Sequence, residues 1–184
     1  MAKLSIVVPC YNEQETIPLS YPAVEKVVRQ MRVETEYWFV NDGSSDQTLA
    51  ELRKLHDQNP ERVHYVSFSR NFGKEAGLYA GLEATTGDYV VVMDADLQDP
   101  PEYLPEMYQE ISSGEYDCVG MRRTDRKGEA KFKSFLSNQF YNVINKISDT
   151  KIVPGARDYR MMTRQMVDAV LSLKEYNRFS KGIF

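Results

Sequence analysis

The sequence predicts an α/β domain with a mostly parallel central sheet and helices on both faces. Short, almost uniformly apolar segments recur along the chain, which is typical of parallel strands covered on both faces. Segments with helical periodicity separate them, and this alternation favours strands joined by helical crossovers. The 184 residues suffice for one domain with a sizeable core. We therefore expect a single domain over residues 1–184, without an internal repeat or linker.

Five segments are predicted as strands from their apolar and β-branched content. They are LSIVV (Leu4–Val8), YWFV (Tyr37–Val40), VHYVSF (Val63–Phe68), YVVVM (Tyr89–Met93) and YDCVG (Tyr116–Gly120).

The first two helices are predicted from proline, serine and leucine positions. The first runs to about Arg32, with Pro18 and Pro22 in its first turn. The second lies in SSDQTLAELRKLHDQ, with Ser44 or Ser45 as its N-cap. Its apolar stripe comprises Leu49, Leu52 and Leu55.

The third helix, KEAGLYAGLEATTG, is rich in small residues. Alanines recur every fourth position with Gly77 and Gly81 beside them, which lets a helix lie close against its neighbour. Gly87 can end this helix.

From Phe132 to Ile147 apolar residues again recur with helical period, which packing on the core explains. The alternative is a helix at the membrane surface that guides a lipid tail.

Composition excludes several function classes. The net charge of -4 gives no global basic field, so we expect no nucleic-acid partner. Cys10 and Cys118 form no C-x-x-C pair, which fits a reducing, intracellular setting better than a disulfide framework or zinc ribbon. His56 and His64 form no zinc-binding pair. The apolar run at the N-terminus is too short for a signal sequence or a membrane span, and we expect no transmembrane segment.

Charge is unevenly distributed along the chain. Between Lys74 and Arg122 there are eleven acidic residues and no lysine or arginine. Arg122 to Lys133 then carries six basic residues. A solvated face is the ordinary explanation of such runs.

Ligands of open α/β sheets bind beyond the carboxyl ends of the strands. The residues at these ends are Pro9 to Glu13, Asn41 to Gly43, Ser69 to Lys74 and Asp94 to Gln98. The chain has no G-x-G-x-x-G, and FGKE lacks the other residues of a P-loop.

Asp94 and Asp96 follow the fourth predicted strand directly. Side chains at i and i+2 of an extended segment lie on one face, so both carboxylates can address one site while Ala95 points away. Mg²⁺ and Mn²⁺ take oxygen ligands, and Mg²⁺ commonly binds one or two carboxylates plus substrate phosphates. The pattern therefore indicates a divalent cation with a diphosphate substrate, and the alternative is a pair of turn or cap aspartates.

Five motifs carry a family resemblance. The segments VVPCYNEQETI, FVNDGSSDQT, SRNFGKEAG, VVMDADLQDPPE and ARDYRMM occur in the order found in family 2 glycosyltransferases of the GT-A fold. The resemblance spans nearly the whole chain, and it is strongest to the branch that makes polyprenyl-phosphate sugars. That branch includes dolichyl-phosphate mannose synthases and bactoprenol glucosyltransferases.

The resemblance implies a Rossmann-like nucleotide-sugar-binding half over residues 1–120. Its donor-binding residues would be Pro9, Tyr11, Glu13, Asp42, Lys74 and Asp94. The cofactor would be Mn²⁺ or Mg²⁺, held by Asp96 with Asp94 and Gln98, and Asp96 and Asp158 would be the catalytic residues. For NDGSSD the alternative is a turn followed by a helix cap.

Residues 121–184 would form the acceptor-binding half. The candidates for binding the acceptor phosphate are Arg122, Arg126, Lys131, Lys133 and Arg160, and arginine can bind two phosphate oxygens at once. Asp158 matches the family's candidate base. A phosphate monoester is already largely ionised at neutral pH, so Asp158 would orient the acceptor or take its residual proton. A salt bridge to Arg157 or Arg160 is the structural alternative.

The resemblance implies an inverting, metal-dependent hexosyltransferase that uses a UDP-glucose or GDP-mannose type of donor and a polyprenyl phosphate. It would act in the cytoplasm at the inner face of the membrane. Assembly into a homo-oligomer is a further possibility. In many relatives the stretch that resembles NRFSKGIF leads into membrane-associated segments, so the chain is expected to be either a trimmed catalytic domain or a short member.

Three alternatives remain. A family 2 enzyme that glycosylates a polysaccharide or protein is the nearest of them. A nucleotidyltransferase usually needs a glycine-rich loop after its first strand, and VVPCYNE contains no glycine. A non-catalytic nucleotide-sugar-binding module could lose Asp158, which is present here.

Overall fold

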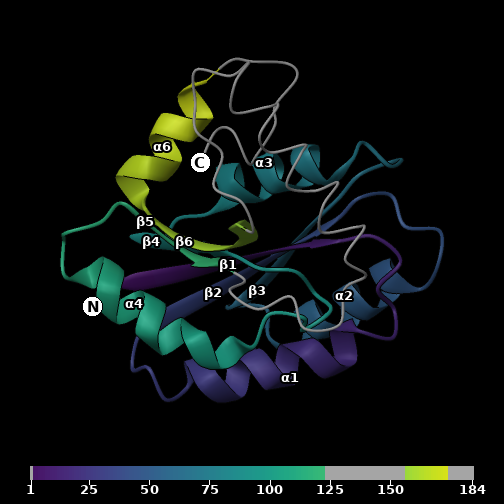
Figure 1. Ribbon diagram of the computed structural model, residues 1–184. Coiled ribbons are helices and arrows are strands. Elements are labelled where there is room, and N and C mark those ends of the chain that lie inside the picture. The colour runs from purple at the N-terminus through teal and green to yellow at the C-terminus, as the bar shows by residue number, and fades with distance from the viewer. Residues whose placement is uncertain (1, 123–155, 174–184) are drawn as a thin grey trace, which may run out of the picture.

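The computed structural model describes residues 2–122 and 156–173, which form a mixed sheet of six strands (Figure 1). The strands are β1 (Lys3–Cys10), β2 (Glu34–Asn41), β3 (Val63–Ser67), β4 (Tyr89–Val92), β5 (Cys118–Arg122) and β6 (Ala156–Thr163). Their order across the sheet is β3-β2-β1-β4-β6-β5. The first four are parallel, and β6 runs antiparallel between β4 and β5. The prediction of a mostly parallel sheet is confirmed.

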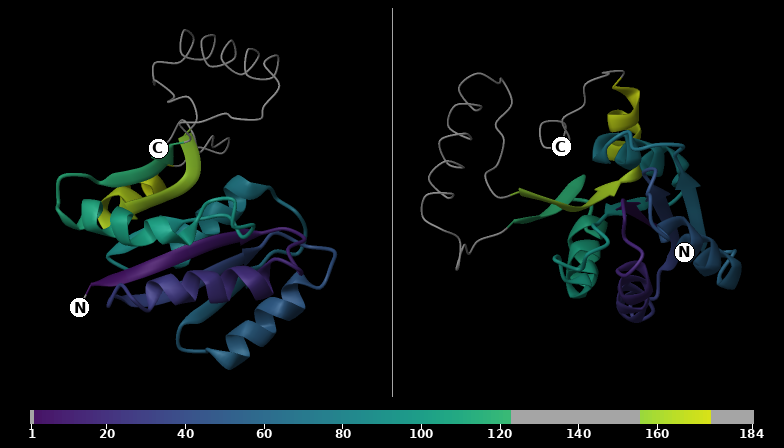
Figure 2. Two further views of the ribbon diagram at one scale, coloured as in Figure 1. Left: turned by 60° about the horizontal axis from the view of Figure 1, so that its bottom comes forward. Right: turned by 90° about the vertical axis from the view of Figure 1, so that its right-hand side faces the viewer.

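Helices cover both faces of the sheet (Figures 1 and 2). One face carries α1 (Ile17–Val28), α2 (Thr48–Gln58), the 3₁₀ helix η1 (Pro101–Tyr103) and α4 (Leu104–Ser112). The other carries α3 (Lys74–Ala84) and α6 (Arg164–Ser172). Successive strand residues point to opposite faces of the sheet and pack into different hydrophobic cores. Ile6 of β1 packs with α1, whereas Val7 packs with α3.

Strand β6 lies outside the predicted strands. Its sequence, ARDYRMMT, intersperses charged with apolar residues, so it lacks the uniform apolar run of β4. Tyr159 and Met161 nevertheless pack into the core on the α1 face, and Met162 packs on the other. Pairing with β4 and β5 buries this strand on both edges, which its own composition does not indicate.

Several helix boundaries differ from the prediction. Pro22 lies inside α1 rather than in its first turn, while Pro18 does occupy the start. Neither Ser44 nor Ser45 caps α2: the N-cap position is Gln47, whose side chain makes no capping hydrogen bond. Asp46, one residue earlier, accepts from the backbone N–H of Thr48 at 2.9 Å through its Oδ1.

The close approach of α3 to the sheet depends on its glycines. Gly77 and Gly81 are buried against β1 and β2, and a Cβ on Gly81 would lie 2.4 Å from Val7 Cγ1. Gly87 does not end the helix, which stops at Ala84. It instead lies against β1, where a Cβ would meet Ser5 Oγ at 2.6 Å.

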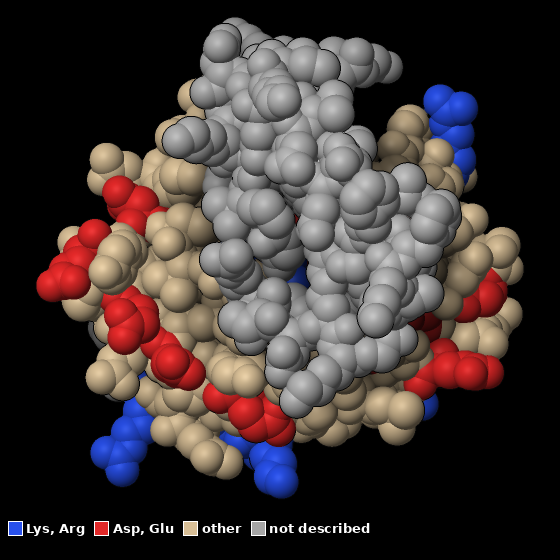
Figure 3. Space-filling view, in the orientation of Figure 1, with Lys and Arg blue, Asp and Glu red and all other residues tan. Residues whose placement is uncertain are grey.

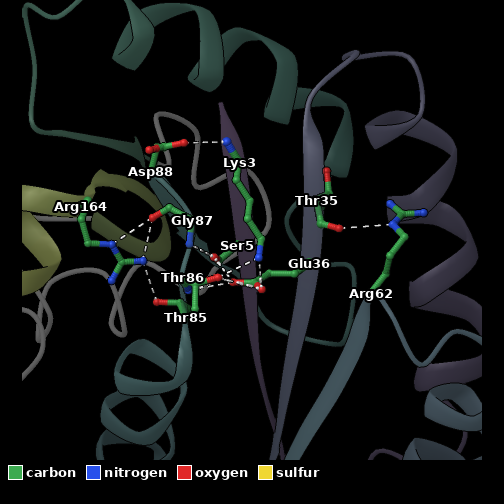
Figure 4. A network of polar contacts seen from close by, with 10 residues as sticks. All are labelled: Lys3, Ser5, Thr35, Glu36, Arg62, Thr85, Thr86, Gly87, Asp88 and Arg164. Atoms are coloured by element: carbon green, nitrogen blue, oxygen red, sulfur yellow. Dashed lines mark hydrogen bonds and ion pairs between the residues drawn. The ribbon is translucent and has the colours of Figure 1, made fainter. Parts of the chain in front are cut away.

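A buried polar network joins the amino-terminal ends of the strands (Figure 4). Glu36 of β2 is 4 % exposed, and its carboxylate accepts hydrogen bonds from Ser5 Oγ at 2.6 Å and from the backbone N–H of Thr86 at 2.8 Å. The ammonium of Lys3 lies 2.6 Å from the same carboxylate. Arg164 at the start of α6 donates to the carbonyl of Gly87, so the network also holds α6.

The acidic residues between Lys74 and Arg122 include some on the exposed surface and some that line a cavity. Glu102, Glu106 and Glu110 are exposed on and before α4, where acidic side chains gather on the surface (Figure 3). For these residues the solvated-face interpretation is confirmed. Asp94 and Asp96 of the same run line a cavity instead.

The predicted helix from Phe132 to Ile147 lies outside the described residues, as does most of the expected acceptor-binding half. Within residues 2–122 and 156–173, no helix has the length and apolar character needed to cross a bilayer.

Candidate active site

An open cavity of about 330 Å³ lies where β1, β2 and β4 end and α3 begins. This is the carboxyl edge of the parallel strands, where α/β sheets bind their ligands. The six predicted donor-binding residues all line it: Pro9, Tyr11, Glu13, Asp42, Lys74 and Asp94. Asp96 lines it as well.

The loop after β1 presents Tyr11 and Glu13 to the cavity. It is fixed by hydrogen bonds to the loop before α2: Asn12 N–H donates to Ser44 Oγ at 2.9 Å, and Glu13 N–H donates to Thr48 Oγ1 at 2.7 Å. Asn12 adopts a positive φ of 57°, which asparagine tolerates better than most residues. Tyr11 is 49 % exposed, so its ring can take a planar ligand without first leaving a packed position.

Asp42 follows β2 directly and is 4 % exposed. Its Oδ1 accepts from the backbone N–H of Phe72 at 2.7 Å, and its Oδ2 accepts from that of Gly73 at 2.9 Å. The carboxylate therefore anchors the loop that leads into α3. The next residue, Gly43, has φ +63°, and a Cβ there would lie 2.1 Å from the backbone of Arg70.

Asp94 and Asp96 reach the cavity from a turn. Strand β4 ends at Val92, and residues 95 and 96 form a turn in which Asp96 Oδ1 accepts from the backbone N–H of Gln98 at 3.1 Å. The expectation of an extended segment with Ala95 pointing away is wrong, since Ala95 is 3 % exposed and also lines the cavity. Gln98 is not among the described residues that line it.

Lys74 connects the cavity to Asp158. Its ammonium lies 2.7 Å from Asp94 Oδ1 and donates to Asp158 Oδ2 at 2.7 Å. Burial alone would lower the pKa of Lys74, but the two carboxylates outweigh it and raise that pKa, so the side chain stays cationic.

Strand β6 is tied to the turn that carries the aspartates. Arg157 forms an ion pair with Asp99, and its guanidinium also donates to the carbonyl of Gln98 at 3.4 Å. Arg160 is 7 % exposed and donates to the carbonyl of Arg157 at 3.0 Å. It lies 3.8 Å from Asp158 Oδ1, so Lys74 is the nearer cation to Asp158 and Arg160 the farther.

The side chains of the other four acceptor candidates lie outside the described part of the chain. Arg122 ends β5, but its side chain lies outside the described part of the chain. Arg126, Lys131 and Lys133 also lie outside it.

Cys10 lines the cavity as a protonated thiol. Burial raises the pKa of Cys10, and the nearby carboxylates of Glu13 and Asp94 raise it further. A thiolate nucleophile is therefore not available at this position at neutral pH.

The oxygen donors in the cavity fit a divalent cation that is shared with a substrate. Within the described ranges, no three His, Cys, Asp or Glu side chains are grouped so that they could hold a metal ion by themselves. Asp94 and Asp96 both line the cavity, and the ammonium of Lys74 beside Asp94 shows that the site accommodates positive charge. Hard cations complete such sets with phosphate oxygens and water.

The sequence did not indicate the loop-anchoring role of Asp42 or the ion pair of Arg157 with Asp99. The pair had one signal in the sequence, the opposite charges of the two residues. Asp99 follows the segment of Asp94 and Asp96, and Arg157 precedes Asp158.

The chain matches the model of glycosyl transferase family 2 over residues 5–171. It belongs to that family. A bactoprenol glucosyl transferase of Shigella phage SfX is 42 % identical over 181 residues, which cover 98 % of this chain and 59 % of the relative. The chain spans little more than half the length of the curated relatives it matches.

Solved structures place the chain in the GT-A fold. A mannosyltransferase, PcManGT, from Pyrobaculum calidifontis in complex with GDP-Man and Mn²⁺ aligns with a TM-score of 0.65 and 22 % identity, over 92 % of this chain and 46 % of that one. Glucosyl-3-phosphoglycerate synthase from Mycobacterium tuberculosis, in complex with Mn²⁺, UDP and phosphoglyceric acid, aligns with a TM-score of 0.62 and 21 % identity, over 90 % and 57 % of the two chains. The predicted fold class is thereby confirmed.

Proposed function

We propose that the protein transfers a hexose from a nucleotide sugar to a polyprenyl phosphate, with a divalent metal ion and with inversion at the anomeric carbon. The observation that carries this proposal is the single cavity lined by the six donor-binding candidates and Asp96. The acceptor class is supported by the family 2 relative that is named a bactoprenol glucosyl transferase. A nucleotide-sugar donor and a lipid acceptor would meet at the cytoplasmic face of the membrane, which is therefore the proposed location of the reaction.

The donor's nucleoside would lie between the loop after β1 and the end of β2. Tyr11 offers ring surface, and Glu13 offers carboxylate oxygens to the ribose hydroxyls. Asp42 would contact the base while it holds the backbone of Phe72 and Gly73, because each carboxylate oxygen has more than one lone pair.

The donor's diphosphate would lie toward Asp94, Asp96 and Lys74. A divalent ion supplies Lewis-acid stabilisation of the charge that develops on a departing diphosphate. Asp96 and Asp94 would hold this ion, and the backbone N–H of Gln98 orients Asp96 for the task. Mn²⁺ and Mg²⁺ both suit these oxygen donors.

The transfer itself joins an oxygen of the acceptor phosphate to the anomeric carbon. The bond from this carbon to the diphosphate breaks on the opposite side, and the nucleoside diphosphate leaves with the electron pair. Asp158 would orient the acceptor or take its residual proton, because the phosphate is already largely ionised. Positive charge for the acceptor would come from Arg160 and from the basic segment that begins at Arg122.

The test of this function is a transfer assay with labelled donor. The protein is incubated with labelled UDP-glucose or GDP-mannose, Mn²⁺ or Mg²⁺, and polyprenyl phosphate, and the organic phase is counted. We expect label in the lipid fraction only when metal is present. Label that appears only on a polysaccharide or protein acceptor would overturn the lipid assignment.

Asp96→Ala should lower turnover by at least about a hundredfold, since a bound metal contributes several kcal/mol to transition-state stabilisation. The matched control is Asp57→Ala, which removes an exposed carboxylate from α2 and should retain activity. Near-normal turnover of the Asp96 variant would contradict the metal role.

A further inference from the structure

The ammonium of Lys74 is held by two carboxylates from different elements. Asp94 follows β4 and Asp158 belongs to β6, and each has one oxygen 2.7 Å from Lys74 Nζ. Lys74 itself is the first residue of α3. A single cation therefore joins the proposed donor site to the proposed acceptor-orienting residue.

This position of Lys74 is not explained by the helix that carries it. The amino end of a helix bears partial positive charge, so a lysine there is less favourable than an acidic residue. The two carboxylates supply the compensation. Without Lys74 between them, Asp94 and Asp158 would face each other across the same space, and among the described residues Arg160 lies near the pair, 3.8 Å from Asp158.

We propose that Lys74 is an internal counter-ion that holds the position between Asp94 and Asp158 until the donor binds. The inference rests on the proposed function, because it concerns the same metal and diphosphate. A divalent ion on Asp94 and the ammonium on the same carboxylate repel each other, so metal binding favours the withdrawal of Lys74. The donor's diphosphate gives Lys74 a new anionic partner on the same side of the cavity, which Lys74 lines.

The exchange couples the two substrates. When Lys74 moves to the diphosphate, Asp158 loses this contact, and its carboxylate can then accept a hydrogen bond from the residual proton of the acceptor phosphate. Without nucleotide, a metal ion that displaces Lys74 from Asp94 leaves the ammonium with no new anionic partner. With nucleotide, the diphosphate supplies that partner. The nucleotide and the metal therefore strengthen each other's binding through Lys74, as linkage requires.

The experiment measures Mn²⁺ binding to the 184-residue chain by the electron paramagnetic resonance signal of free Mn²⁺, with and without UDP. Lys74→Met removes the charge and keeps the length of the side chain. Without UDP, we expect this variant to bind Mn²⁺ about five- to tenfold more tightly than the wild type, which corresponds to about 0.5–0.7 kcal/mol for each of two partly exposed ion pairs. With UDP present, the strengthening of Mn²⁺ binding should be smaller in the variant than in the wild type.

Two further variants separate this role from a general charge effect. Lys54→Met removes a lysine of α2 whose side chain is 65 % exposed and should leave both Mn²⁺ affinities unchanged. Lys74→Arg keeps the cation and should leave Mn²⁺ binding without UDP within about twofold of the wild type. Circular dichroism checks that each variant is folded.

The outcomes distinguish this inference from the proposed function. If the wild type binds Mn²⁺ with UDP but Lys74→Met does not tighten binding without it, the counter-ion role is overturned and the metal-dependent function stands. A wild type that binds no Mn²⁺ even with UDP overturns both. Tightening by Lys54→Met to the same degree would also overturn the counter-ion role, because it would assign the effect to net charge.

Discussion

The carboxylate of Asp42 shapes the cavity from beneath the loop that leads into α3. Both of its oxygens accept backbone hydrogen bonds, from Phe72 at 2.7 Å and from Gly73 at 2.9 Å. Lys74 follows Gly73 directly, so the position of its side chain depends on this anchor. A substitution at Asp42 should therefore weaken donor binding through the loop as well as through any contact with the base.

Asp42→Asn tests the anchor. The amide can accept at one oxygen only, and its N–H₂ group opposes the N–H of Phe72 or Gly73. Gly73 N–H has a second acceptor in Asn71 Oδ1 at 3.0 Å, so we expect a moderate loss of about 1–2 kcal/mol in the free energy of unfolding. The dissociation constant for UDP should rise about tenfold.

Urea unfolding and calorimetric UDP titration measure the two effects of Asp42→Asn, with Asp57→Asn on the exposed side of α2 as control. Weaker UDP binding with unchanged stability would show that Asp42 acts on the ligand alone and not on the loop.

At the scale of single residues, the sequence predicted which residues line the cavity better than it predicted how their side chains are arranged. Carboxyl ends of neighbouring parallel strands meet at one edge, so Asp42 and Asp94 could be assigned to one cavity. The contact of Lys74 with Asp158 could not be predicted, because it requires knowing that β6 lies beside β4. The turn at residues 95 and 96 agrees with the alternative of turn aspartates rather than with the favoured extended segment. Leu97, with φ 55°, gave no sign of it, because leucine does not favour this conformation.

At the level of elements, the packing of α3 depends on where its small residues face. The sequence correctly indicated a close approach, but the alternation of alanine and glycine did not show which residues meet the sheet. Gly81 lies over Val7 and Val40, with a Cβ position 2.4 Å from Val7 Cγ1 and 3.2 Å from Val40 Cγ2. At Gly77 the corresponding nearest distance is 3.7 Å, an ordinary contact.

The two glycines form a matched pair for a stability test. Gly81→Ala should lower the free energy of unfolding by about 1–2 kcal/mol, because overpacking outweighs the gain in helix propensity. Gly77→Ala should raise it by up to about 1 kcal/mol, because the propensity gain meets no clash. Guanidinium unfolding of both variants measures the difference, and equal effects would contradict the close approach at Gly81.

Over the whole molecule, the two edges of the sheet have different roles. The carboxyl edge carries the cavity, and the amino edge carries the network of Lys3, Glu36, Thr86 and Arg164 (Figure 4). The predicted strand limits began after Lys3 and Glu36, because polar residues do not indicate strand. Both strands extend to include them, and their charges meet because β1 and β2 pair in parallel register.

This network should make stability depend on pH through Glu36. Burial disfavours its charged form, but hydrogen bonds from Lys3, Ser5 and the backbone of Thr86 outweigh burial and lower the pKa of Glu36 from 4.5 to about 2. A carboxyl group with a lowered folded-state pKa contributes stability above the unfolded-state value and loses it as pH falls through the folded-state value. The contribution of Glu36 should therefore be complete above pH 4.5 and decline toward pH 2.

Glu36→Gln removes this titration and should lower the free energy of unfolding at pH 7 by about 1–3 kcal/mol. Thermal or urea unfolding of variant and wild type at pH 7, 4 and 2.5 should show a difference that shrinks as the pH falls. Glu34→Gln is the matched control, since Glu34 begins the same strand but is exposed, and it should change stability by less than about 0.5 kcal/mol. A difference between Glu36→Gln and the wild type that stays constant with pH would mean that the amino edge is held by packing rather than by the ionised carboxylate of Glu36.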